Sequence, residues 1–409
     1  MTAVLERFLR YVQYDTQADE NSTSYPSTSK QLVLLRDLAQ ELRSLGLADA
    51  AIDEYGYVTA TVPSTSEKTV PAIGFIAHVD TSPEVTGANV RPIVHERWDG
   101  RDIILPDDPS TMLRPSDCAP LAERVGDDIV TASGTTLLGA DNKAGVAEIV
   151  TAADYLVRHA EIAHGPIKIA FTPDEEIGRG TQYFDVKRFG AAYAYTMDGS
   201  TRGELEFESF SADAMTVTFT GFNTHPGYAK DQLVNAIKAA GEFLAHLPRD
   251  MSPERTEGYD GFVHPYVLQG GVEKASVRFI IRDFRTAALG DKEQALERLA
   301  RDAAARYGAR IDIVIEEQYR NMREVLDRHP HVVDYAREAI RRAGMEPRER
   351  PIRGGTDGSK LSFMGLPTPN IFAGEHNFHS RLEWVSAQDM EKAVEVIVNL
   401  VRIWEERSS

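Results

Sequence analysis

Two adjacent carboxylates, Glu175 and Glu176, stand where a predicted strand ends in this sequence of 409 residues. They belong to the stretch FTPDEEIGR, which follows the strand-forming residues Ile167 to Phe171. A proline ends that strand, and a glycine permits the turn after it. An isolated acidic pair is usually a solvated turn. Adjacent carboxylates repel each other unless a cation separates them or their roles differ, so one could bind a metal while the other moves protons.

The same residue types recur where other predicted strands end or a helix begins. They are His78 and Asp80 after residues 70–77, Asp141 at the start of a helix, Asp198 after residues 191–196, and His379 after residues 368–373. In open α/β sheets, ligands bind at the carboxyl ends of the strands. Residues i and i+2 of an extended segment point to one side, so the Asp80 carboxylate can lie behind a metal-binding His78.

The combination of imidazoles and carboxylates without thiolates favours zinc, or manganese and cobalt as substitutes. Two histidines and three carboxylates exceed the ligand number of one tetrahedral zinc ion. They suit two metal ions that share a bridging carboxylate, roughly 3.5–4 Å apart. One member of the Glu175–Glu176 pair is then left to act as general base on a metal-bound water.

Strand and helix patterns alternate through the first half of the chain and again near its end. This alternation predicts an α/β fold with a mostly parallel, helix-covered sheet. Between residues 209 and 318 the order changes to βαββαβ, which predicts an inserted α+β unit. The flanking residues, 1–208 and 319–409, would then form one discontinuous domain. Ser386 with Asp389 predicts a capping box at the start of the last helix.

Composition excludes some classes of partner. The net charge of −18 argues against a nucleic-acid surface and against a polybasic membrane anchor. The single cysteine, Cys118, excludes an intramolecular disulfide and fits a reducing compartment. No apolar run reaches transmembrane length, and the first residues lack the apolar core of a signal peptide. We therefore expect a cytoplasmic protein, whose oligomeric state the sequence does not indicate.

Motifs spread over nearly the whole chain resemble the peptidase T family, the tripeptide aminopeptidases among the di-zinc exopeptidases. This superfamily also contains aminoacylases, desuccinylases and dipeptidases. Three motifs look specific to the peptidase T family within this superfamily: SYPST (24–28), GELEFE (203–208) and HNFHS (376–380). The motifs shared across the superfamily are GFIAHVDTSPE (74–84), TTLLGADNKAG (135–145), FTPDEEIGRG (171–180), TMDGS (196–200), NTHPG (223–227), IIRDF (280–284) and GGTDG (354–358).

The resemblance implies a role for each candidate residue. The implied metal ligands are His78 and Asp198 on one zinc ion, Glu176 and His379 on the other, and Asp141 as the bridge. Glu175 would be the general base, and Asp80 would orient His78. In the inserted unit, which would act as a lid, His225 would stabilise the oxyanion. Arg282 would bind the substrate carboxylate, with Arg353 assisting. A cis peptide bond between Asp141 and Asn142 is also implied.

The function implied by the resemblance is a metal-dependent aminopeptidase that removes the N-terminal residue of tripeptides through a metal-activated water. Its cofactors would be two divalent metal ions, with Zn²⁺ as the first choice. One alternative keeps this chemistry but acts on N-acyl amino acids or dipeptides. Another is a catalytically inactive protein that binds peptides or metal. The intact Glu175 argues against it, because binding alone does not need a free base beside two metals.

Overall fold

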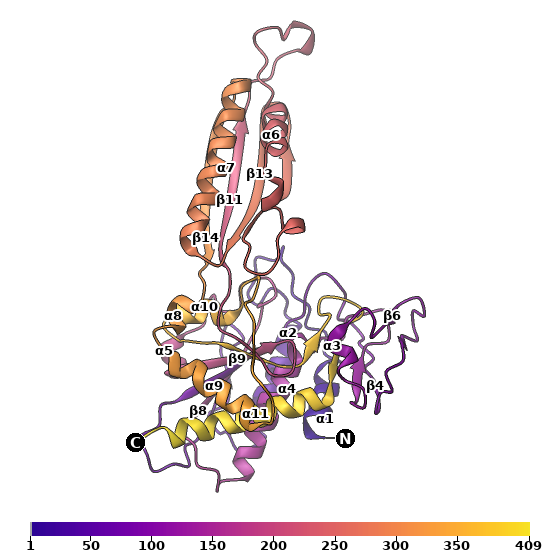
Figure 1. Cartoon of the computed structure of the whole chain (residues 1–409), viewed down its shortest axis with the longest axis vertical. Coiled ribbons are helices and arrows are strands. Elements are labelled where there is room, and N and C mark those ends of the chain that lie inside the picture. Colours follow the sequence, from indigo (N-terminus) through magenta and orange to yellow (C-terminus); the bar gives the residue numbers. More distant parts are fainter. Residues whose placement is uncertain (1) are drawn as a thin grey trace. The chain divides into compact units, whose positions relative to one another are not determined.

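The computed structural model describes residues 2–409, and the chain divides into two compact units (Figure 1). The first unit comprises the chain up to Phe207 together with Val325–Arg350 and Thr356–Ser409. The second unit comprises Glu208–Glu324 and Pro351–Gly355. The second unit therefore extends beyond residue 318. It also takes in residues 351–355, which include the first two glycines of the GGTDG motif.

The first unit is built on an eight-stranded mixed sheet with the order β1-β2-β8-β3-β9-β16-β10-β15. Its strands are β1 (Ala51–Ile52), β2 (Val58–Val62), β3 (Ile73–His78), β8 (Ile167–Thr172), β9 (Tyr193–Gly199), β10 (Glu204–Glu206), β15 (Arg348–Glu349) and β16 (Asn370–Phe372). The four central neighbours β8, β3, β9 and β16 run parallel. Strands β1, β2 and β10 join antiparallel toward the two edges. The predicted α/β class is confirmed.

Helices cover both faces of this sheet, as the wholly buried strand β3 requires. On one face, α4 (Ala140–Arg158) packs on β3 and β9. A Cβ at Gly145 of α4 would lie 2.0 Å from the Met197 carbonyl oxygen, so the helix can approach β9 this closely only with glycine there. On the other face, the core around α5 (Val186–Phe189) and α10 (Asp357–Phe363) contains Tyr57, Ile76, Ala170, Phe184, Phe189, Ala194, Leu361 and Leu366.

The remaining elements of the first unit surround α4 and the sheet. Helices α1 (Ala3–Tyr11) and α11 (Ala387–Glu406) pack on α4, α9 (Pro330–Arg342) packs on α11, and α2 (Gln31–Ser44) packs on β2. Two small sheets contain β4 (Ile93–His95), β7 (Ile129–Thr131), β17 (Glu375–His376) and β18 (Trp384–Ser386), and β5 (Ile103–Ile104) with β6 (Met112–Leu113). The short helix α3 (Ala119–Ala122) also belongs to this unit, and the boundary between the two units falls within the short helix α8 (Arg323–Leu326). No helix within residues 2–409 combines the length and apolar character that a bilayer span requires.

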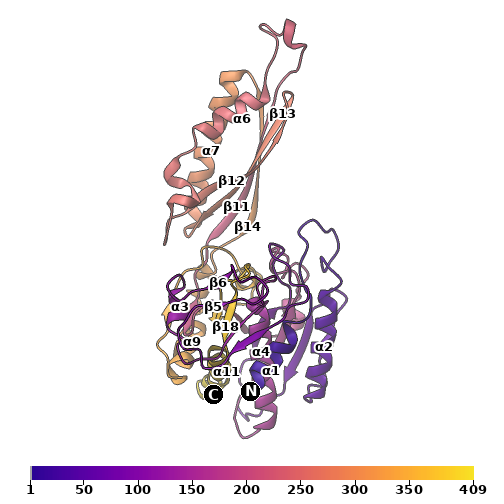
Figure 2. The same cartoon turned by 90° about the vertical axis from the view of Figure 1, so that its right-hand side faces the viewer.

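The second unit has the predicted βαββαβ order and a four-stranded antiparallel sheet, β12-β13-β11-β14. Its elements are β11 (Ser211–Thr220), α6 (Ala236–Ala245), β12 (Phe262–Gly270), β13 (Lys274–Asp283), α7 (Thr286–Tyr307) and β14 (Arg310–Tyr319), with three 3₁₀ turns, Pro226–Tyr228, Arg249–Met251 and Pro253–Arg255. Both helices lie on one face of the sheet (Figure 2). Met215, Val217 and Phe219 are buried in the core that these helices close, while the intervening threonines are half-buried.

The predicted capping box at the start of α11 is only half formed. The Asp389 N–H donates to Ser386 Oγ at 3.3 Å, so Ser386 caps the helix. The Asp389 carboxylate does not return the bond; it accepts from Arg124 Nε at 2.7 Å and from Arg202 Nε. The physical reason is that Arg124 is buried and needs a counter-charge more than the helix end needs a second cap.

We expect Asp389→Ala to lower the free energy of unfolding of the first unit by about 3–5 kcal/mol, because the buried Arg124 guanidinium loses its 2.7 Å ion pair and keeps only the longer one to Glu123 at 3.5 Å. Urea-induced unfolding measures this change. Glu395→Ala on the same helix is the control, since its ion pair with Lys392 is solvent-exposed and worth at most about 1 kcal/mol. Equal effects of the two substitutions would contradict the expectation.

Candidate metal centre

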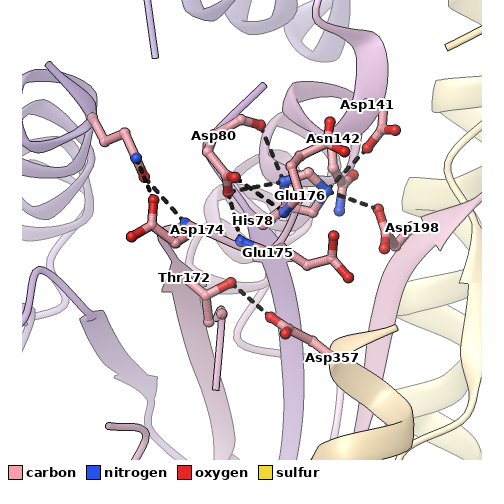
Figure 3. A network of polar contacts seen from close by, with 12 residues as sticks. His78, Asp80, Asp141, Asn142, Thr172, Asp174, Glu175, Glu176, Asp198 and Asp357 are labelled. Carbon is pink, nitrogen blue, oxygen red and sulfur yellow. Dashed lines mark hydrogen bonds and ion pairs between the residues drawn. The ribbon is translucent and has the colours of Figure 1, made fainter. Parts of the chain in front are cut away.

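His78 ends β3 at the carboxyl edge of the parallel strands, and its ring lies among three carboxylates (Figure 3). Its Nε2 lies 2.9 Å from Asp141 Oδ1 and 3.3 Å from Asp198 Oδ1, while Nδ1 lies 3.3 Å from Asp80 Oδ1. Burial opposes the charged form of the ring, but these carboxylates outweigh burial and raise the pKa of His78 well above its ordinary value. The ring is therefore held where a cation is strongly favoured.

His379 makes a matching arrangement on the other side of Asp141. Its Nε2 lies 2.7 Å from Glu176 Oε2 and 3.4 Å from Asp141 Oδ2. Burial again opposes the charged form, but hydrogen bonds to Asp141 and Glu176 outweigh it and raise the pKa of His379 to about 11. Asp141 thus turns one carboxylate oxygen toward each imidazole. The peptide bond between Asp141 and Asn142 is cis, as the resemblance implied.

The donor atoms form two groups that fit a pair of divalent metal ions. The ligand atoms of His78, Asp141 and Asp198 lie within 4.8 Å of one another, as do those of Asp141, Glu176 and His379. Each group combines one imidazole with two carboxylates, which is the donor chemistry of Zn²⁺ and of related first-row metals. Because Asp141 belongs to both groups, a carboxylate shared between two ions is consistent with the geometry.

Asp80 holds two parts of this centre at once. Its Oδ1 accepts the Glu175 N–H at 3.0 Å, and its Oδ2 accepts the Glu176 N–H at 3.1 Å. The same carboxylate lies beside His78 Nδ1, so it contacts both the ligand ring and the turn that carries the acidic pair. The sequence predicted only the contact between Asp80 and His78. The hydrogen bonds to the turn could not be predicted, because residue type and spacing do not indicate bonds to backbone N–H groups.

Glu175 carries the one carboxylate of the acidic pair that faces no imidazole. Its side chain extends from the turn toward Asp198 and Asp357 (Figure 3). Within residues 2–409, no hydrogen bond or ion pair holds it. Burial raises the pKa of Glu175 well above its ordinary value; the His78 charge opposes this shift, and the carboxylates of Asp357 and Asp198 add to it. A free carboxylate with a raised pKa beside the two ligand groups has the properties of a general base.

Glu383 is a buried carboxylate that the sequence reasoning missed. Its Oε2 accepts the N–H groups of Leu138 and Gly139, both at 2.7 Å, and its Oε1 accepts the Asp141 N–H at 3.0 Å. Burial raises the pKa of Glu383 to about 7, although these backbone donors oppose the shift. Glu383 therefore fixes the backbone from which Asp141 projects. Its position four residues after His379 is the only sequence signal that could have indicated it.

The other predicted site residues, His225, Arg282 and Arg353, all lie in the second unit. His225 is exposed, and its Nδ1 accepts the Gly227 N–H at 3.1 Å. The neutral ring then carries its proton on Nε2, which is free to donate. Arg282 is half-buried on β13, with its guanidinium 5.2 Å from the centre of the Tyr319 ring, and burial lowers its pKa.

Arg353 is more constrained than the other two. Its Nη1 donates to the carbonyl oxygens of Gly258 and Asp260 at 2.7 and 2.9 Å, and its Nη2 donates to Thr256 Oγ1 at 3.1 Å. The guanidinium also lies 5.1 Å from the centre of the Phe210 ring. These contacts hold the loop around residues 256–260, and assistance to Arg282 in substrate binding stays a prediction.

Comparison with known proteins gives a consistent result over the whole chain. The profile of Peptidase family M20/M25/M40 matches residues 115–403. Peptidase T of Geobacillus kaustophilus is 51% identical over 407 residues and that of Clostridium acetobutylicum 49% over 408 residues, covering 99% and 100% of both chains. The fold is similar to those of an aminopeptidase PepT from Bacillus cereus (TM-score 0.76, 22% identity, 98% of both chains) and a Staphylococcus aureus tripeptidase (TM-score 0.77, 22% identity, 99% and 98%). A dinuclear metal-binding M20 peptidase from Bacillus subtilis aligns with a TM-score of 0.67 at 15% identity, over 98% of this chain and 97% of its own.

The raised pKa values of His78 and His379 predict that metal binding displaces protons. Metal affinity should therefore rise with pH between pH 6 and 8, by roughly tenfold per pH unit for each proton displaced. Competition with a chelator at several pH values measures this slope in protein first freed of metal. His159→Gln, which alters an exposed histidine outside the two groups, should leave the slope unchanged. An affinity that does not depend on pH would mean that both rings are already neutral.

Proposed function

The chain belongs to peptidase family M20/M25/M40, and from this premise we infer that it is a metal-dependent aminopeptidase that releases the N-terminal residue of tripeptides. The observation that carries this inference is the pair of ligand groups sharing Asp141, with the unpaired Glu175 carboxylate beside them. Identity of about half over the full length to proteins named Peptidase T supports the tripeptide substrate.

We propose that His78 and Asp198 hold one ion, that Glu176 and His379 hold the other, and that Asp141 faces both. Zinc is our proposed metal, because the donors are imidazole nitrogen and carboxylate oxygen only. When bound, two such ions supply Lewis acidity, which lowers the pKa of a water molecule and polarises the scissile carbonyl. We also propose a cytoplasmic location, which the single cysteine supports.

Glu175 performs the proton transfers in this proposal. Its carboxylate takes a proton from the attacking water and then delivers it to the nitrogen of the leaving amine. The raised pKa suits both steps, because the group must hold the proton between them. Asp80 acts through its neighbours. Its carboxylate contacts Nδ1 of His78 and so orients the ring with Nε2 toward Asp141 and Asp198.

The second unit is proposed to act as a lid over the substrate. His225 would donate its Nε2 proton to the oxyanion of the tetrahedral intermediate, a contact worth about 3–4 kcal/mol in other hydrolases. Arg282 would pair with the free carboxylate of the tripeptide through its planar guanidinium. The insertion of this unit into the chain, the exposed ring of His225 and the position of Arg282 on the sheet face opposite to the two helices support this assignment.

A substrate series tests the proposed function directly. A dipeptidase or a deacylase of N-acyl amino acids could use the same ligand set, so the metal centre alone does not select among them. The purified protein should hydrolyse a tripeptide much faster than a dipeptide or an N-acetyl amino acid of matched side chains, with metal content measured on the same sample. A preference for either of the other two substrates would replace the proposed function.

We expect Glu175→Ala to lower kcat by about 10²–10⁴-fold while both metal ions stay bound. The reason is that Glu175 contacts no imidazole and belongs to neither ligand group. Steady-state kinetics and metal analysis on one sample decide the matter. Glu148→Gln is the control, because Glu148 is a buried carboxylate on α4 and neither of its oxygens has a hydrogen-bond partner within residues 2–409. Loss of one ion from Glu175→Ala would instead make Glu175 a ligand.

The second-unit assignment predicts that Arg282→Ala raises KM for tripeptides by about 10–100-fold, because a charged hydrogen bond to the substrate is worth about 1.5–3 kcal/mol. A tripeptide with an amidated C-terminus should bind more weakly to the parent protein but suffer no further loss in this variant. Arg278→Ala is the matched control, since Arg278 lies on the same strand and face. If amidation weakens binding equally in both proteins, Arg282 does not bind the carboxylate and Arg353 becomes the better candidate.

A further inference from the structure

Asp174 begins the turn that carries Glu175 and Glu176, and its backbone is left-handed, with φ of +58°. Residues other than glycine adopt this conformation rarely, and aspartate does so where its side chain is held by hydrogen bonds. The turn closes through Gly178 N–H to Glu175 O at 2.6 Å and Arg179 N–H to Asp174 O at 2.8 Å. Asp174 is fully buried, so its carboxylate requires hydrogen-bond partners. We call residues 174–180 the base turn.

The partners of Asp174 come from a segment 147 and 143 residues earlier in the chain. Ser27 donates twice, from its N–H to Oδ2 at 2.6 Å and from its Oγ to Oδ1 at 2.5 Å. Gln31 donates from Nε2 to Oδ1 at 2.6 Å and accepts the Asp174 N–H on its Oε1 at 3.1 Å. Both residues are buried, so water does not compete for these bonds.

The same segment also holds the other end of the base turn. Arg179 Nη1 donates to the Ser22 carbonyl oxygen at 2.9 Å. The Tyr57 hydroxyl donates to the Gly180 carbonyl oxygen at 2.9 Å. The Tyr25 hydroxyl forms a hydrogen bond with the Tyr57 hydroxyl and lies 3.3 Å from the Arg179 carbonyl oxygen. Residues 22–31, which include the SYPST motif, therefore contact both ends of the turn. We call this segment the clamp.

We propose that the clamp is a positioning element for catalysis, which sets the direction of the Glu175 carboxylate and of the Glu176 ligand by fixing the base turn at both ends. This inference rests on the proposed role of Glu175. It accounts for the SYPST motif, which supplies no metal ligand and no proton-transfer group. A misplacement of about 1 Å of a catalytic group can cost a hundredfold in rate, so fixing the turn has a direct effect on turnover.

The clamp acts together with Asp80 rather than in place of it. Asp80, just after β3, accepts the N–H groups of Glu175 and Glu176. Ser27 and Gln31 hold the side chain of Asp174, the residue that directly precedes this pair. If Asp174 were released, the two N–H groups would no longer be directed at the Asp80 oxygens. Loss of the hydrogen bonds between the clamp and Asp174 is therefore expected to change the conformation of the base turn first, and not substrate binding.

The decisive test compares three substitutions at Asp174. Asp174→Ala removes the carboxylate and disfavours the left-handed backbone, whereas Asp174→Gly removes the carboxylate but permits that backbone. Both should lower kcat by about 10–100-fold, the usual effect of removing a group that orients a site residue, with KM changed by less than about threefold. Asp174→Asn, which keeps one acceptor oxygen, should recover part of the loss. Parent-like turnover in Asp174→Gly would overturn the proposal, because backbone conformation alone would then suffice.

A second measurement avoids both substrate and metal. Hydrogen exchange at the Glu175 and Glu176 amides, followed in metal-free protein, should quicken in Asp174→Ala and in the milder Ser27→Ala. Asn89→Ala is the matched control: Asn89 is an exposed residue with φ of +60° outside the base turn, and its substitution should leave both amides unchanged. Unchanged exchange in both clamp variants would overturn the proposal, even if their turnover falls.

Failure of the clamp and failure of the proposed function give different results. If Glu175→Ala abolishes turnover but Asp174→Ala and Ser27→Ala do not lower it, the clamp proposal is wrong and the assignment of Glu175 stands. If Glu175→Ala retains turnover, the assignment of the base is wrong, and the clamp proposal falls with it. Metal titration adds a third readout, since clamp variants should weaken the ion proposed at Glu176 and His379 more than the ion proposed at His78 and Asp198.

Discussion

Electrostatic repulsion among closely spaced carboxylates is the constraint on which the rest of the first unit depends. The carboxylates near the site are those of Asp80, Asp174, Asp357 and Glu383, which are buried, and those of Asp141, Glu175, Glu176 and Asp198, which are half-buried. Asp141, Glu176 and Asp198 face the two imidazoles, where cations are favoured. Asp80, Asp174 and Glu383 each accept N–H groups of the protein. Asp357 accepts the Thr172 hydroxyl at 3.0 Å. Within residues 2–409 the Glu175 carboxylate has no partner of any of these kinds, and this difference sets it apart chemically from its neighbours.

The carboxylates that accept backbone N–H groups also determine where the other side chains point. Asp80 and Asp174 fix the turn after β8, and Glu383 fixes the backbone at the start of α4. The parallel centre of the sheet brings these segments to one edge, because strands that run the same way end on the same side. The close approach of α4 to β9 at Gly145 then places the start of that helix, and with it Asp141, near the end of β9.

The residues with side-chain chemistry could be predicted because strand ends are visible as apolar runs followed by a polar residue. The structure brings His78, Asp141, Glu176, Asp198 and His379 together as two groups, although their individual roles stay predictions. The role of Glu383 could not be predicted, since it acts through peptide N–H groups that residue types share. The bonds of Asp174 could not be predicted because their side-chain partners, Ser27 and Gln31, lie more than 140 residues away in the sequence. The prediction of the second bond of the capping box was wrong for a related reason. Arg124, which donates to the Asp389 carboxylate instead, is distant from it in the sequence.

The order of these residues along the chain bears on how the protein is made. The two ligand groups draw on segments from residue 78 to residue 379, with the second unit encoded between them. The segment that contains His379 also contains Glu383, which holds the backbone of Asp141. During synthesis, domains form as their residues emerge from the ribosome. A nascent chain that ends before residue 376 lacks both His379 and Glu383, so the ligand set is complete only after the second unit and residue 379 have been translated.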